Sequence, residues 1–474
     1  MSISTPENAR DAFAARPSMP SRWQEARRLL MIAGPLAAAY LAELAMSLTT
    51  KSIVGQLGYR ELAGIGLAAD TAAEIVVVLV GTLSVVGVLV AQAEGGGRKA
   101  DAGLAARQGL IVATALGVAA TAMIWHLDVL LSWTGQDPEI IALMGPYLKP
   151  LSASVLPVLW FFALRTFVAA LAKTWAILLI AVVAVGLNYV LSLGLVHGAF
   201  GLPALGVAGA GWAKTIVSSL MFLAVLAYTY FTPTFRGYGL FRERLSLDLG
   251  ACREIFRLGI PVAGIVILEM GLFVAVAIFS GQLGAVPLAT YQVMLAWIGI
   301  AFMTAHGLAE AGMIRVAHGI GRNSLASARQ AGLLTFAMGV GWLVLLIAVP
   351  LKYPEPLVRI FLDENDPGFS KVLSLTTQLL YLAAFFQIFD GLQVMASLAL
   401  RGLRDTIVPL WCATLGYWVF GVGGGWLLAF PLGMGAHGLW WGMAVGLTVT
   451  GSLLAVRFVV LTAHMAENDT TYPP

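Results

Sequence analysis

The chain contains a series of apolar runs, most of them 20 residues or longer, that recur from about residue 29 to residue 462. A helix of about 20 residues spans the roughly 30 Å hydrocarbon core of a bilayer, and it satisfies its backbone polar groups within the segment. We therefore predict an all-α integral membrane protein with twelve transmembrane helices. The predicted spans are 28–52, 62–92, 104–127, 146–172, 175–199, 204–231, 258–282, 286–314, 328–350, 373–400, 407–430 and 436–462.

Charged residues are few, and their placement indicates an orientation. They make up 11% of the sequence, against about 25% in soluble domains. Basic residues gather in the tail 1–27, the central loop 233–257 and the other loops on that side, whereas Asp137 and Asp363 lie in acidic loops opposite. The positive-inside rule then places both termini in the cytoplasm of an inner-membrane protein. Because the bias follows alternate loops, we expect no nucleic-acid partner.

Two segments bear on processing and redox chemistry. The N-terminal tail is polar and lacks an apolar core, so it is not a secretory signal. The two cysteines fall in the basic central loop (Cys252) and in a predicted helix (Cys412), so no disulfide framework is expected.

The sequence repeats itself at about half its length. "GQLG" occurs at 55–58 and at 281–284, 226 residues later, and the same offset relates Pro35 to Pro261 and Glu43 to Glu269. An ordered series of such matches predicts two six-helix lobes, in the same orientation because six is even. The predicted divisions are tail 1–27, N-lobe 28–232, linker 233–257, C-lobe 258–462 and tail 463–474. Such parallel repeats place a substrate site between the halves.

Several motifs resemble the multidrug and toxic compound extrusion (MATE) family, nearest its NorM-like branch. They include "GQLGYRELAGIGLA" (55–68), "TGQDPEIIALMGPYL" (134–148), "IPVAGIVILEMGLF" (260–273) and "FFQIFDGLQVMASLALRGLRDTIVP" (385–409). The resemblance covers roughly residues 25–460. It implies export of small lipophilic, often cationic compounds in exchange for Na⁺ or H⁺, with no cofactor. We expect the protein to act as a monomer in the bilayer.

Two carboxylates are the main candidates for ion coupling. Glu269 lies at the centre of its predicted span and Asp390 well inside another. A charge at such a depth costs about 2.5–3.5 kcal/mol on insertion scales and usually marks an ion or proton path. Burial favours the protonated form of a carboxyl group, so each could carry a proton or ligate Na⁺. The resemblance aligns both with functional acidic residues of the family. The alternative is a structural role, in which each carboxyl group forms a hydrogen bond with a neighbouring helix.

The first span departs from the family pattern. NorM-like proteins usually carry an aspartate near the outer end of the first helix, where this chain has Thr50. Glu43 lies seven residues earlier, close to two helical turns, and we expect it to serve the same cavity from a deeper level. Asp70 and Glu74, on one face of the second span, could assist it, and we expect both of them and Thr50 to line the substrate cavity. Lys51 either extends to the membrane interface or pairs with one of these carboxylates.

Other polar residues within spans have less specific interpretations. Asn188 either bonds a neighbouring helix or contacts the substrate, and Tyr291 and Gln292 either line the cavity or pack. We expect interface anchoring for three residues near predicted cytoplasmic span ends: Arg165, Glu310 and Arg315. The glycines at 438, 442 and 446 form a small-residue stripe that is typical of helix packing.

Three other functions remain possible from the sequence. A membrane-embedded enzyme would ordinarily show a metal or nucleophile constellation, and no histidine pair is spaced to hold zinc on a helix. A lipid-linked sugar flippase would favour an arginine-rich cavity, whereas the central spans show carboxylates and few arginines. A channel agrees less well with repeated halves and buried acids. We therefore favour an exporter of cationic compounds.

Overall fold

The chain folds into two bundles of helices that stand side by side. The computed structural model describes residues 20–133, 138–242, 246–362, 364 and 366–470, so Asp137 and Asp363 lie outside the described residues. The N-lobe comprises α2 (Arg22–Gly55), α3 (Tyr59–Gly95), α4 (Lys99–Trp125), α5 (Leu127–Ser132), α6 (Pro138–Ser152), α7 (Val155–Ala170), α8 (Thr174–His197), η1 (Ala199–Gly201) and α9 (Val207–Phe231). After η2 (Pro233–Tyr238), the C-lobe comprises α10 (Leu249–Leu283), α11 (Ala285–Gly321), α12 (Leu325–Lys352), α13 (Pro354–Arg359), α14 (Phe369–Gly402), α15 (Ile407–Ala413), the π-helix η3 (Thr414–Gly423), α16 (Gly424–Ala429) and α17 (Gly435–Thr470).

The prediction of twelve spans is confirmed. In the part of the chain that the structure describes, eleven helical segments are long and apolar enough to cross a bilayer, and α6 with α7 forms one further span that is bent by 44°. The break lies where Pro157 has no N–H to donate and its ring would clash with the carbonyl of Ala153. One predicted span, 407–430, is continuous but passes through the π-helix between α15 and α16.

The first helix of each lobe begins earlier than predicted. α2 starts at Arg22, where Ser21 and Gln24 form a capping box, and α10 starts at Leu249, where the Asp248 carboxylate accepts hydrogen bonds from two backbone N–H groups. The linker is therefore shorter than 233–257. Cys252 lies buried in α10, so its predicted place in a basic loop is wrong. Both cysteines are free.

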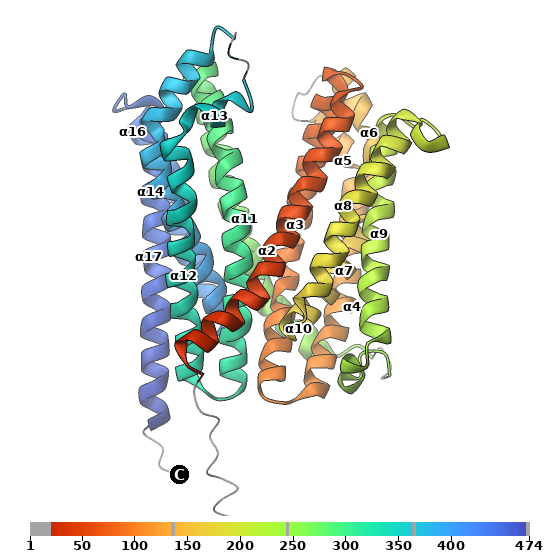
Figure 1. Cartoon of the computed structure of the whole chain (residues 1–474), viewed down its shortest axis with the longest axis vertical. Coiled ribbons are helices and arrows are strands. Elements are labelled where there is room, and N and C mark those ends of the chain that lie inside the picture. Colours follow the sequence, from red (N-terminus) through yellow and green to blue (C-terminus); the bar gives the residue numbers. More distant parts are fainter. Residues whose placement is uncertain (1–19, 134–137, 243–245, 363, 365, 471–474) are drawn as a thin grey trace, which may run out of the picture.

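These two long helices cross from one lobe to the other. In Figure 1, α2 begins beneath the C-lobe, at the end of the molecule where the C-terminus lies, and rises into the N-lobe. We call this end the terminal face and the other end the opposite face. A Cβ on Gly307 of α11 would lie 2.6 Å from the backbone nitrogen of Ala37 in α2. At the repeat-related position, a Cβ on Gly81 of α3 would lie 3.7 Å from the Cα of Ala263 in α10, which is an ordinary van der Waals contact. The closer approach at Gly307 requires a residue without a side chain.

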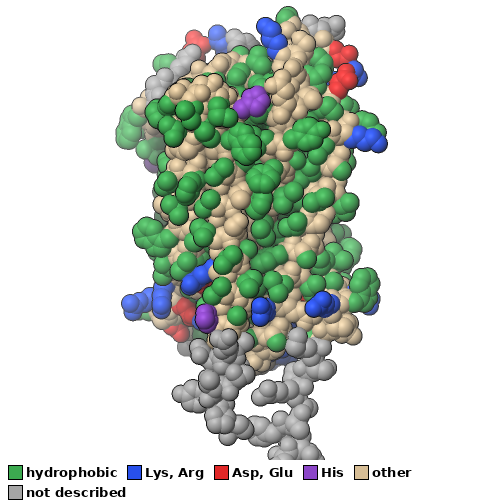
Figure 2. All heavy atoms as spheres, turned by 90° about the vertical axis from the view of Figure 1, so that its left-hand side faces the viewer, with side chains coloured by type: hydrophobic (Ala, Val, Ile, Leu, Met, Phe, Trp, Pro, Cys, Tyr) green, Lys and Arg blue, Asp and Glu red, His purple; other side chains and the backbone are tan. Residues whose placement is uncertain are grey.

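The outer surface matches a membrane environment. Figure 2 shows hydrophobic side chains over the middle of the C-lobe, with most Lys and Arg side chains near its lower end. Large exposed apolar residues of α17 belong to this surface, among them Trp441, Val445 and Val456. In water such a continuous apolar face would be an aggregation liability; in lipid it is the contact surface.

The glycine stripe of α17 packs as predicted. A Cβ on Gly442 would lie 2.3 Å from the Cα of Gly425, and one on Gly446 would lie 2.6 Å from the carbonyl oxygen of Gly416. The partners belong to α16 and to the π-helix η3. The glycines therefore allow backbone contact within the C-lobe.

Replacing Gly442 with alanine should destabilise the protein. The methyl group has no space against Gly425, and overpacking of this kind costs about 1–3 kcal/mol. Gly186→Ala is the control, because nothing lies within 4 Å of a Cβ there and alanine favours a helix over glycine. Thermal unfolding in detergent should show a lower midpoint for Gly442→Ala alone; equal midpoints would contradict the packing assignment.

Candidate functional site

A large cavity lies between the two lobes. Its volume is about 560 Å³, and the N-lobe helices α2, α3, α4, α6, α7, α8 and α9 line it together with α10, α11 and α14 of the C-lobe. This volume falls within the usual range of small-molecule sites, about 300–1,000 Å³. Most lining residues are apolar, and the aromatic ones are Tyr40, Tyr147, Phe161, Phe162 and Phe302. The cavity can therefore surround a drug-sized apolar molecule.

Charged side chains of both signs line this cavity. The carboxylates are Glu43, Glu269 and Glu310, and the cations are Lys51, Arg165, Lys214 and Arg401. The expected carboxylates and few arginines are present, but with two lysines the cations outnumber the carboxylates by four to three. Arg165 and Arg401 lie near the ends of predicted spans and turn inward instead of facing the membrane interface.

Arg165 is the centre of a buried cluster that joins the lobes. Its side chain is 1% exposed and lies 3.5 Å from Glu43 of α2 and 3.5 Å from Glu310 of α11. The guanidinium group also stacks 4.3 Å from the ring centre of Tyr40, whose hydroxyl donates a 2.7 Å hydrogen bond to Glu310. The interface-anchoring prediction is wrong for Arg165 and Glu310, because both lie inside the protein.

Further polar contacts close the cavity toward the terminal face. Arg315 donates to both carboxylate oxygens of Glu25, at 2.6 and 2.8 Å, and both side chains are buried. Arg315 is therefore an inter-lobe residue and not an interface anchor. On the other side of the crossing, Arg404 donates to Gln92 at 2.5 Å, and Gln92 donates to the carbonyl of Gly402 at 3.0 Å. Each of these bonds joins the N-lobe to the C-lobe.

The structure brings Glu269 and Asp390 together within the C-lobe. Glu269 lines the cavity, whereas Asp390 of α14 is buried behind it, within electrostatic reach of Glu269. One Asp390 oxygen and the side-chain oxygen of Gln393 are buried without a hydrogen-bond donor. Gln393 also donates to the hydroxyl of Tyr417 in the π-helix η3. The carboxylate oxygen of Asp390 is suited to accept a proton, and both oxygen atoms are suited to ligate a hard cation.

This pair is not part of a larger metal-binding cluster. Among the described residues, no group of three or more His, Cys, Asp or Glu side chains is arranged to hold a metal ion.

Asn188, one of the predicted polar residues of the N-lobe, forms hydrogen bonds with α2 near Thr50. Asn188 donates to the carbonyl of Met46 at 3.2 Å and to the hydroxyl of Thr50 at 3.1 Å, and both Asn188 and Thr50 line the cavity. Asn188 thus makes the expected bond between helices and also reaches the cavity.

Lys51 pairs with Asp70, at 2.7 Å. Asp70 and Glu74 are exposed and are not among the cavity-lining residues, so the prediction that they line the substrate cavity is wrong. They lie on an exposed face of α3, which the sequence pattern does not distinguish from the face that lines the cavity.

Tyr291 and Gln292 do not line the cavity, contrary to one of the two alternatives. Tyr291 is buried, donates a 2.8 Å hydrogen bond to the carbonyl of Phe273 and packs beside Trp440, while Gln292 is exposed. Tyr291 therefore has the packing role.

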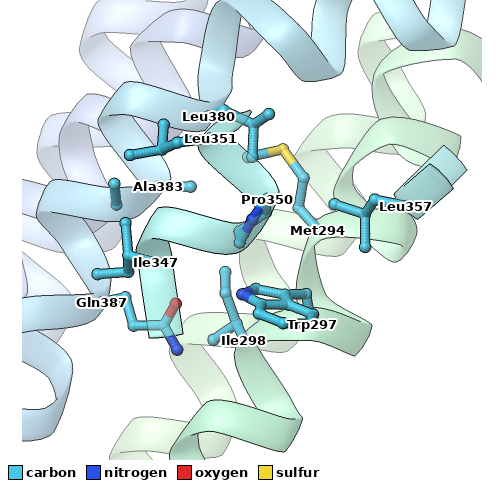
Figure 3. Close-up of a pocket in the computed structure, with 11 residues that line it drawn as sticks. Met294, Trp297, Ile298, Ile347, Pro350, Leu351, Leu357, Leu380, Ala383 and Gln387 are labelled. Atoms are coloured by element: carbon cyan, nitrogen blue, oxygen red, sulfur yellow. The ribbon is translucent and has the colours of Figure 1, made fainter. Parts of the chain in front are cut away.

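A second pocket lies within the C-lobe, between α11, α12, α13 and α14 (Figure 3). Met294, Trp297, Pro350 and Leu380 contribute to its apolar wall, and Gln387 is its one amide side chain. Its volume of about 20 Å³ corresponds to about one water molecule. The cavity between the lobes is therefore the candidate substrate site.

The Arg165 cluster makes a prediction for stability. Arg165→Met removes the cation that lies 3.5 Å from Glu310 and leaves Glu310 with the more weakly coupled Arg401, which should lower the free energy of unfolding by up to about 3–5 kcal/mol. Glu310→Gln on top of it should restore part of that loss, because the poorly compensated charge is removed. Arg60→Met, in an exposed pair with Glu139, is the control and should cost less than about 1 kcal/mol. Unfolding midpoints of the single and double variants form the test; purely additive effects would show that Arg165 and Glu310 do not interact.

Comparison with known proteins agrees with this architecture. The chain is 36% identical over 434 residues to a probable multidrug resistance protein NorM from Pseudomonas putida, covering 92% of this chain and 94% of that protein. It is 36% identical to the multidrug resistance protein NorM of Burkholderia vietnamiensis, covering 95% and 97%.

Solved structures show the same fold. The eukaryotic MATE transporter AtDTX14 matches with a TM-score of 0.83 at 22% identity, covering 95% of this chain and all of that chain. An outward-facing multidrug resistance MATE transporter matches with a TM-score of 0.84 at 19% identity, covering 93% and 96%.

The family model confirms the internal repeat as well. The MatE model matches residues 35–193 and, a second time, residues 261–427. The two matches begin at Pro35 and Pro261, the equivalent prolines of α2 and α10, and together they cover most of both lobes. With twelve spans in two lobes around a shared cavity, the chain belongs to the MatE family of multidrug and toxic compound extrusion transporters.

Proposed function

We propose that this protein is a secondary active exporter that moves small lipophilic, often cationic compounds out of the cytoplasm in exchange for H⁺ or Na⁺. The observation that carries the proposal is the 560 Å³ cavity between two repeated lobes, with Glu269 on its wall. Relatives named multidrug resistance proteins, which align over more than 90% of this chain, support the substrate class. The apolar and aromatic wall suits lipophilic cations, which aromatic rings attract through their π faces.

The coupling ion binds, in this proposal, at Glu269 and Asp390. Glu269 connects the site to the cavity, and Asp390 holds an oxygen atom without a hydrogen-bond donor behind it. A proton or a Na⁺ ion entering there competes with a cationic substrate for the same carboxylate, which is a requirement of antiport. Glu43 is the repeat-related carboxylate of the N-lobe. Its ion pair with Arg165 of the same lobe holds the guanidinium group that reaches Glu310 of the other lobe, in addition to any part that Glu43 has in coupling.

The terminal face lies in the cytoplasm in this proposal. Arg and Lys of the described loops, such as Arg98, Lys99 and Arg236, lie on that side, as the positive-inside rule requires. The inter-lobe bonds of Glu25 and Gln92 then close the cytoplasmic side of the cavity. Substrate exchange with the cytoplasm requires these bonds to break and the lobes to rock about the cavity.

Cysteine labelling tests the orientation. In a variant with Cys252→Ser and Cys412→Ser, a single cysteine replaces exposed Ser246 before α10 or exposed Glu355 in α13. An impermeant maleimide added to intact cells should label Glu355→Cys, and Ser246→Cys should react only after permeabilisation. Labelling of Ser246→Cys from outside would reverse the topology.

Neutralising the coupling pair should abolish driven efflux. Glu269→Gln and Asp390→Asn keep the size of each side chain but cannot cycle a proton or hold a cation well. We expect efflux to fall at least about tenfold, or about 1.4 kcal/mol of activation free energy, at matched abundance in the membrane. Inverted vesicles with separately imposed Na⁺ and pH gradients provide the measurement and identify the coupling ion. Glu139→Gln, at an exposed glutamate outside the cavity, should transport normally; normal transport by both coupling variants would refute the assignment.

A further inference from the structure

The charged groups that line the cavity differ in how far they are already paired. Lys51 is held by Asp70 at 2.7 Å, and Arg165 lies between Glu43 and Glu310 at 3.5 Å from each. Arg401 donates to Ser84 of the other lobe at 2.8 Å and lies within electrostatic reach of Glu310 and Glu269. These three cations therefore have partners in the protein.

Lys214 of α9 is different. It lines the cavity from the N-lobe, and its side chain forms no ion pair or hydrogen bond with any residue in the described part of the chain. Glu43 is within electrostatic reach but forms its ion pair with Arg165 instead. A cation placed at membrane depth without a partner is costly and usually functional. The ammonium group thus faces the cavity with its hydrogen-bond donors free.

Glu269 is the counterpart of Lys214 on the other lobe. It is the cavity-lining carboxylate for which the described residues provide neither an ion pair nor a hydrogen bond. Lys214 lies seven residues from the end of α9 at the opposite face, and Glu269 lies fourteen residues from the corresponding end of α10. At a rise of 1.5 Å per residue, they lie about 10 and 20 Å below those ends. A free cation and a free carboxylate thus stand on different lobes and at different depths.

We propose that Lys214 is a specificity-determining residue of this cavity: its ammonium group receives the acidic group of a substrate whose cationic group faces Glu269. This inference rests on the proposed export function and adds a specificity-determining residue to it. A molecule that carries both charges compensates both free groups at once, and the apolar wall between them surrounds its aromatic body. A purely cationic compound compensates Glu269 alone and leaves Lys214 unpaired.

A matched pair of dyes tests the proposal. Rhodamine B carries a carboxylate beside a delocalised cation, and its ethyl ester keeps the cation but lacks the acid. Equilibrium binding to purified protein in lipid nanodiscs is measured for wild type, Lys214→Gln and Lys214→Arg, and efflux of both dyes is measured from cells. We expect Lys214→Gln to weaken binding of rhodamine B about tenfold while binding of the ester stays within about twofold, and Lys214→Arg to retain most of the affinity for the acid.

The comparison variant is Lys51→Gln, whose ammonium group is already engaged by Asp70; it should change the ratio of the two affinities less than Lys214→Gln does. Equal loss for both dyes in Lys214→Gln, no loss for either, or wild-type protein that does not bind rhodamine B would overturn the assignment. Wild-type protein that binds both dyes with the expected Lys214 dependence but exports neither would refute the export function and leave the binding role of Lys214 standing.

Discussion

The rest of the structure depends on the close crossing of α2 with α11 and of α10 with α3. The backbones of α2 and α11 approach so closely at Gly307 that a side chain there would clash with Ala37, and Gly81 contacts Ala263 at the equivalent place in the other repeat. The crossing occurs twice because the sequence is repeated, once in each of the two lobes that the repeat relates. It also carries Glu43 and Glu269, each eight residues after its proline, to the wall of the same cavity. Without the crossing, these carboxylates would belong to separate bundles.

Polar bonds at this crossing set how easily the lobes can part. Buried ion pairs add little net stability, because desolvation offsets most of their attraction, but each bond is lost if the terminal face opens. A typical hydrogen bond contributes about 1 kcal/mol, and the bonds of Glu25, Gln92, Tyr40 and Ser84 all cross between the lobes. Moving a two-state equilibrium from 1:99 to 99:1 takes about 5.5 kcal/mol. The inter-lobe bonds are therefore of the size that differential binding of an ion or substrate can overcome.

Much of the fold could be predicted because it follows from apolar length, but the ends of the helices could not. The first turns of α2 and α10 carry polar and charged residues, which resemble loop sequence even though Ser21 and Asp248 cap them as helix starts. Both caps are visible in the sequence and could have extended the predicted spans. The direction in which each helix face points was harder to predict from the sequence. Tyr291 and Asp70 lie on spans with little amphipathic pattern, so only the packing of the helices shows where their side chains point.

The candidate site was predictable where the repeat identified it. Glu43 and Glu269 stand at equivalent positions, and the structure places both on the cavity wall. Arg165 and Glu310 were assigned to the interface because depth was judged from the distance to the end of a span. Lys214 was not identified, although a lysine inside an apolar span is itself a signal of a functional site. In a two-lobed protein the interior extends to the terminal face, so a residue near the end of a span can still be buried between the lobes. An arginine in an otherwise apolar span is therefore a sign of an internal ion pair as well as of an interface.

The arrangement of the buried ion pairs explains how the two lobes can move apart without leaving these charges unpaired. Arg165 contacts one carboxylate of its own lobe, Glu43, and one of the other lobe, Glu310, while Arg401 of the C-lobe lies within electrostatic reach of Glu310. Separation of the lobes at the terminal face would part Glu310 from Arg165. Each lobe would then keep a cation and a carboxylate of its own: Arg165 with Glu43, and Arg401 with Glu310. Because each of these four residues keeps a counter-charge in its own lobe, the costly case of a broken pair is avoided at this cluster. The same four residues can therefore hold the lobes together in one state and balance one another within each lobe in the other.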